Sequence, residues 1–93
     1  MRGKSIMSDE KRCYITGAEW GLHVHHVIHG PLREMADRNG FWCYLRHDIH
    51  RKLHDHAPGF GDLDEFLKRE CQTRFEKEHS RDEWMMLVKR NYL

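Results

Sequence analysis

The chain has 93 residues, enough for one small domain but not for two hydrophobic cores. Its 16 lysines and arginines against 15 aspartates and glutamates give a formal charge of +1, which excludes a strongly basic nucleic-acid coat protein. The number of cysteines is three, which is odd, so we expect free thiols rather than a disulfide framework.

Residues 1–11 have no apolar periodicity, and we expect them to form a flexible tail before a single domain over 12–93. No apolar run reaches the length of a membrane span, and the polar N-terminal stretch lacks the apolar centre of a signal peptide. We therefore expect a soluble, cytoplasmic protein that does not contact a membrane.

Strand-forming residues dominate the first half of the domain. Residues 13–15 and 20–28 predict two strands joined by a knuckle-like turn. Residues 31–40 predict a helical turn, 41–45 predict a further strand, and the spacing that follows predicts a helix to about residue 56.

The second half reads as two helices after a break at 57–61. Asp62 occupies an expected N-cap position, and the apolar residues that follow recur at helical spacing, which predicts a helix over 63–79. These apolar residues are Leu63, Phe66, Leu67, Cys71 and Phe75. Ser80 and Glu83 form a capping-box pattern that predicts a last helix to about residue 90. We expect this helical part, 62–93, to cover a core formed by residues 12–56.

Eight of the nine histidines lie between Leu22 and His56. His50 and His54 are four residues apart on a predicted helix, so both imidazoles face one side. His25 and His26 lie in the preceding strand and can supply a third ligand, which leaves coordination positions for water or substrate. This stretch indicates a metal-dependent catalytic site.

Strand geometry restricts the adjacent pair. Neighbouring residues of a regular strand point to opposite faces, so His25 and His26 reach one site only at a strand end or a local twist. His23 shares a face with His25 and is an alternative ligand. We expect His29, His47 and His56 to be solvated or to support the ligands.

The order of these residues resembles a known motif. An adjacent His25-His26 pair, a loop and a strand, and then His50-x3-His54 on a helix resemble the HNH, or ββα-metal, nuclease motif. The second helix histidine matches the version found in colicin-type nuclease domains. Residues 13–93 are similar to small phage and prophage HNH-like proteins. The resemblance implies an α+β fold with a ββα-metal core and two C-terminal helices packed on it.

The resemblance also implies a role for each histidine. His25, His50 and His54 correspond to the ligands of one divalent metal ion, and His26 corresponds to the general base. The motif's asparagine orients the base; Asn39 is the only asparagine in the interval, with closing a turn as its alternative role. The implied activity is hydrolysis of DNA phosphodiester bonds by a metal-dependent endonuclease.

Three imidazoles favour Zn or Ni as the bound ion, while Mg or Mn can still support activity in the open positions. Arg46, Arg51 and Lys52 flank the histidines. We expect them either to bind the phosphate backbone of DNA with salt-sensitive affinity or to form a plain solvated face.

The chain departs from many relatives in one respect. They carry two C-x2-C pairs that hold a structural zinc, whereas this chain has Cys13-x2-Thr16 and Arg46-x2-Ile49. We therefore expect the structural zinc to be absent. Packing should replace it, through Tyr14, Ile15, Trp20, Tyr44, Leu45 and Ile49. The same departure motivates an alternative function, a non-catalytic, metal-stabilised ββα module that binds DNA or a protein partner.

Overall fold

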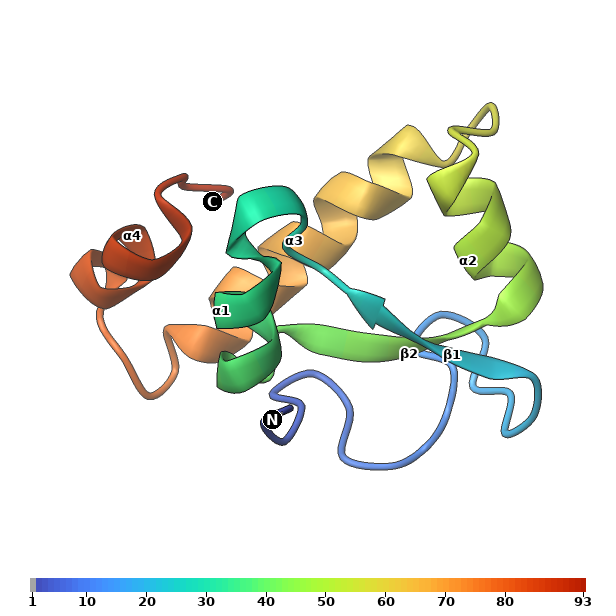
Figure 1. The fold of residues 1–93 in the computed structure, drawn as a ribbon, viewed down its shortest axis with the longest axis horizontal. Coiled ribbons are helices and arrows are strands. Elements are labelled where there is room, and N and C mark those ends of the chain that lie inside the picture. The colour runs from blue at the N-terminus through green and yellow to red at the C-terminus, as the bar shows by residue number, and fades with distance from the viewer. Residues whose placement is uncertain (1) are drawn as a thin grey trace.

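The computed structural model describes residues 2–93 and confirms the α+β class. Its elements in chain order are β1 (Leu22–His26), the 3₁₀ helix η1 (Gly30–Leu32), α1 (Arg33–Asn39), β2 (Trp42–Arg46), α2 (His47–His54), α3 (Gly61–Phe75) and α4 (Arg81–Val88). β1 and β2 pair antiparallel, with His25 opposite Cys43 and His26 opposite Trp42. The helix α2 follows β2 directly, and α3 runs from the α2 end of the molecule to the α4 end (Figure 1).

Aromatic side chains join the sheet to the last two helices. Phe41, which immediately precedes β2, packs edge to face on Phe75 of α3, with ring centroids 5.5 Å apart. It also contacts Trp84 of α4 at 5.2 Å between centroids, and both Phe41 and Trp84 are fully buried. Leu67 and Cys71 continue this buried face of α3, because residues four apart lie on one side of a helix.

Two details of the predicted α3 were wrong. Its N-cap is Phe60, so Asp62 lies in the first helical turn, where its charge still complements the helix dipole. Phe66 is 40 % exposed because it lies one residue, or about 100° of helical rotation, from the buried Leu67. The predicted capping box of α4 is confirmed, since Ser80 accepts from the Glu83 amide and the Glu83 carboxylate accepts in return.

The predicted strand over 13–15 is instead part of a turn. The Cys13 amide donates to the Ala18 carbonyl at 2.8 Å, and the chain reverses at Gly17, whose φ is 78°. The Cys13 sulfur accepts from the backbone amides of Thr16 at 3.5 Å and Arg46 at 3.3 Å. The Tyr14 amide donates to the Tyr44 carbonyl of β2 at 2.8 Å, but this contact does not form a strand, and the sheet of residues 2–93 has two strands.

The packing expected in place of a structural zinc is found only in part. Leu45 is fully buried, and Tyr14 and Ile49 pack against the core. Trp20 is 65 % exposed and Ile15 is 39 % exposed, so these two do not supply the packing that was predicted for them. Both lie in the segment before β1, outside any helix or strand.

The segment expected to be a flexible tail contacts the domain. It contains no helix or strand over residues 2–11, but Ser5 and Met7 are buried, and the Ser5 hydroxyl donates to the Trp42 carbonyl. Gly40, with φ 75°, ends α1 directly beside this segment, and a Cβ there would overlap the Lys4 carbonyl. These contacts attach the segment along β2.

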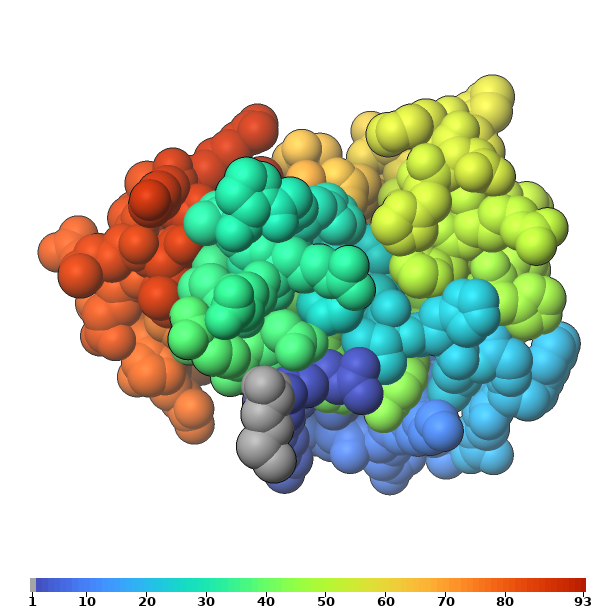
Figure 2. All heavy atoms as spheres, viewed as in Figure 1, coloured from blue at the N-terminus to red at the C-terminus, as the bar shows by residue number. Residues whose placement is uncertain are grey.

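The space-filling view places α4 and α2 at opposite ends of the molecule, with α1 between them on the visible face (Figure 2). Within residues 2–93, no helix combines the length and the apolar character needed to cross a bilayer. The histidine-rich part of the chain lies at the α2 end.

Candidate metal centre

His25 is the best-buried histidine of the predicted site. It lies on β1 and is 1 % exposed, and neither ring nitrogen has a hydrogen-bond partner among the described residues. Burial, followed by the neighbouring His29, lowers the pKa of His25 to about 3. The ring is therefore neutral at physiological pH, the state in which imidazole binds a metal.

His50 and His54 face His25 from α2. Their Nε2 atoms are 2.9 Å apart, and one ligand atom from each of the three histidines lies within 4.8 Å of the others. The three residues predicted as ligands are thus close enough to hold one ion. The lack of partners on the His25 ring fits this use, because coordination through its one free lone pair would remove the free-energy penalty of leaving that buried nitrogen unpaired.

His23, predicted as an alternative ligand, contacts a ligand instead. Its Nδ1 lies 3.2 Å from Nδ1 of His50, while Nε2 of His50 points to His54. A hydrogen-bond partner on Nδ1 leaves Nε2 as the nitrogen of His50 that can bind an ion. Burial, followed by His54 and His23, lowers the pKa of His50 to about 4.

His26 leaves β1 on the other face and contacts α1. Its Nε2 lies 2.8 Å from Oδ1 of Asp37, and this hydrogen bond lowers the pKa of Asp37. With Nε2–H donated to a carboxylate, the free lone pair of a neutral His26 is on Nδ1. His26 also lines a hollow of about 400 Å³ together with His50 and His54. His25 and His26 point to opposite faces of β1, yet both lie beside His50 and His54, because the strand ends at His26.

The other predicted site residues do not line this hollow. Arg46 forms a bidentate ion pair with Asp48 at 2.7 and 2.9 Å. Arg51 and Lys52 are exposed on α2, with the Lys52 ammonium 5.8 Å from the Phe60 ring centroid. Asn39 donates to the Met35 carbonyl at 2.8 Å and ends α1, which agrees with the turn-closing alternative.

Four residues near the histidines were not selected from the sequence. Asp37 contacts His26, Arg33 lines the same hollow, and His29 and Asp64 form a second group with His25. His29 follows His25 by four residues, a spacing that carries no signal outside a helix. Asp64 reaches the site only because α3 packs beside α2, which no local pattern indicates.

Comparison with protein-family models, curated proteins and solved structures gives no match to this chain. The functional assignment consequently depends on the chemistry of the site itself.

Proposed function

We propose that this protein is a metal-dependent endonuclease of the ββα-metal type, which hydrolyses DNA phosphodiester bonds. The observation that carries the proposal is the buried, unpaired His25 beside His50 and His54, with His26 next to it in sequence and lining a hollow together with His50 and His54. Two features support the fold assignment: the antiparallel pairing of β1 and β2, and the position of α2 directly after β2.

Each residue has a separate task in this proposal. His25, His50 and His54 would hold one divalent ion, which would supply Lewis-acid stabilisation of the charge that develops during phosphodiester hydrolysis. His26 accepts a proton from the attacking water at Nδ1, while Asp37 holds Nε2. The water oxygen forms a bond to phosphorus, the bond to the leaving sugar oxygen breaks, and that oxygen takes a proton from solvent.

The charge around the hollow fits a phosphate group. Arg33 lines it together with His26, and α1 begins at Arg33. An exposed guanidinium at this place can bind a phosphate through two parallel hydrogen bonds. We assign Arg33 to the DNA backbone in preference to Arg46, whose guanidinium is already paired with Asp48.

The test is a plasmid-nicking assay with wild type, His26→Ala, His50→Ala and the control His47→Ala, in Mg, Mn, Ni or Zn. His47 is exposed on α2, the helix that carries His50, and belongs to neither group of candidate ligands. We expect both site variants to lose on the order of 100-fold or more in rate and the control to stay near wild type. If wild type binds metal but never nicks DNA faster than His26→Ala, the non-catalytic binding module is the better assignment.

A further inference from the structure

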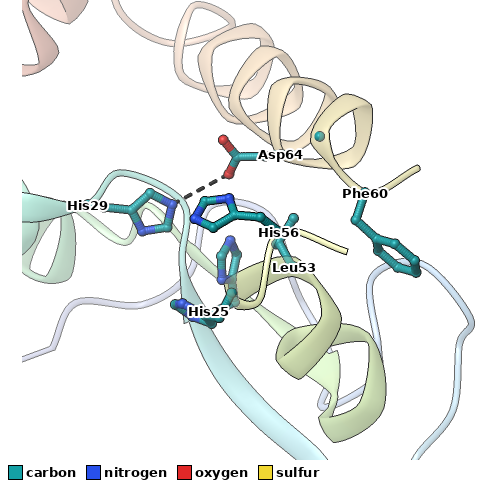
Figure 3. A pocket seen from close by; sticks show the side chains of 8 residues that line it. His25, His29, Leu53, His56, Phe60 and Asp64 are labelled. Carbon is teal, nitrogen blue, oxygen red and sulfur yellow. Dashed lines mark hydrogen bonds and ion pairs between the residues drawn. The ribbon is translucent and has the colours of Figure 1, made fainter. Parts of the chain in front are cut away.

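A second group of candidate ligand atoms shares His25. One atom each from His25, His29 and Asp64 lies within 4.8 Å of the other two. The three residues come from β1, the loop after it and the first turn of α3, and they line a pocket of about 400 Å³. In Figure 3 the His29 ring and the Asp64 carboxylate face each other, with His25 beneath them.

The carboxylate in this group is held in place. Asp64 Oδ2 accepts from the Lys68 ammonium at 2.8 Å, which leaves Oδ1 directed at His29, 3.4 Å from its Nε2. The hydrogen bond from His29, with that from Lys68, holds the pKa of Asp64 well below its usual range. Asp64 is therefore ionised at neutral pH and offers one oxygen to the pocket, as a monodentate ligand would.

The two groups differ in the ions that suit them. Three imidazoles suit Zn²⁺ and Ni²⁺, whereas replacing an imidazole by a carboxylate makes a harder ligand set that suits Mn²⁺ better. A neutral imidazole donates one lone pair, so His25 can serve one ion at a time. The two groups are thus alternatives for a single ion and do not form a dinuclear centre.

We propose that His25, His29 and Asp64 form a second cation position, which takes Mn²⁺, while His25, His50 and His54 take Zn²⁺. Two observations carry the inference: the buried His25 ring has no hydrogen-bond partner among residues 2–93, and one ligand atom each of His29 and Asp64 lies within 4.8 Å of it. The proposal concerns metal choice and holds whether or not the protein cuts DNA.

The test is a crossover of two metals and two sets of variants. Mn²⁺ binding is measured from the electron paramagnetic resonance signal of the free ion, and Zn²⁺ binding by calorimetry. We expect His29→Ala and Asp64→Asn to weaken Mn²⁺ binding by at least about tenfold and Zn²⁺ binding by less than about threefold. We expect His50→Ala to weaken Zn²⁺ binding strongly and Mn²⁺ binding little.

The matched control is Asp62→Asn, which removes the same charge from an exposed position in the same turn of α3. Mn²⁺ binding that is unchanged in His29→Ala, or weakened as much by Asp62→Asn as by Asp64→Asn, would overturn the proposal. Equal weakening of both metals by His29→Ala would also overturn it. If Asp64→Asn does not fold, His29→Ala decides, because that side chain is 42 % exposed. A Zn²⁺ affinity unaffected by His50→Ala would instead contradict the three-histidine site of the proposed function.

Discussion

His26 Nε2 and Asp37 Oδ1 form a hydrogen bond of 2.8 Å between the end of β1 and the middle of α1. The side chain of His26 is 15 % exposed and that of Asp37 is 30 % exposed, so the pair borders solvent while remaining ordered by the strand and helix that carry it. Because a carboxylate can only accept, Asp37 fixes the hydrogen on Nε2 and leaves Nδ1 of His26 as the proton acceptor.

Asp37→Asn should therefore lower the nicking rate by about 10- to 100-fold, because an amide also donates and permits the other His26 tautomer. Bound metal and melting temperature should stay near wild type, since asparagine has nearly the same shape. The measurement is the nicking rate at saturating metal, with Glu34→Gln as a control that removes an exposed carboxylate from the same helix. Equal rates in the two variants would show that Asp37 does not position His26.

The metal-free protein should lose stability on mild acidification. The pKa of His25 is about 3 in the folded chain and near 6.5 when unfolded, so the unfolded chain binds more protons below pH 6.5. The contribution of His25 is complete above pH 6.5 and is lost as the pH falls toward the folded pKa. Between pH 7.5 and 5 the loss should be on the order of 2 kcal/mol for His25 alone.

Urea unfolding in the presence of EDTA at several pH values measures this loss, and His25→Gln should flatten the dependence in the same interval. A control, His79→Ala, removes a histidine at the other end of the molecule that is paired with Glu83 at 3.0 Å. A wild-type free energy of unfolding that stays constant from pH 7.5 to 5 would contradict the buried, neutral state of His25.

Local periodicity placed His50 and His54 together, and the resemblance to the HNH motif selected His25 as the third ligand. His50 and His54 lie together because residues four apart share a helix face whatever the rest of the chain does. Strand alternation correctly predicted that His25 and His26 point to opposite faces. The structure shows that β1 ends at His26, which lets both residues lie beside the same histidines. Helix types and order, including the capping box at Ser80, follow from similarly short-range patterns.

Contacts between elements could not be found in this way. Asp37 meets His26 because α1 folds back on β1, and Asp64 meets His29 across 35 residues of chain. Neither acid has a neighbour in sequence that distinguishes it from a solvated surface charge. The exposure of Trp20 was missed for a related reason, since an aromatic residue in a loop is buried only if another element covers it.

Leu67 and Phe66 provide a test of which face of α3 is buried. Leu67 is fully buried and Phe66 is 40 % exposed. Leu67→Ala should lower the free energy of unfolding by about 2–5 kcal/mol through lost burial and a cavity, whereas Phe66→Ala should have a much smaller effect. Denaturant unfolding of the two variants measures the difference, and a larger effect at Phe66 would contradict the packing of α3 on the sheet.

Substitutions at Gly40 and Gly59 test whether the N-terminal segment packs against the folded domain. Both have positive φ, 75° and 87°, so alanine at either position should cost about 1–2 kcal/mol in backbone strain. At Gly59 a Cβ would meet nothing within 4 Å, whereas at Gly40 it would overlap the Lys4 carbonyl. Gly40→Ala should therefore lower the melting temperature more than Gly59→Ala, and the extra loss should disappear when residues 1–6 are deleted from both variants. Equal losses in the full-length chain would mean that the N-terminal segment does not pack against α1 and β2 in solution.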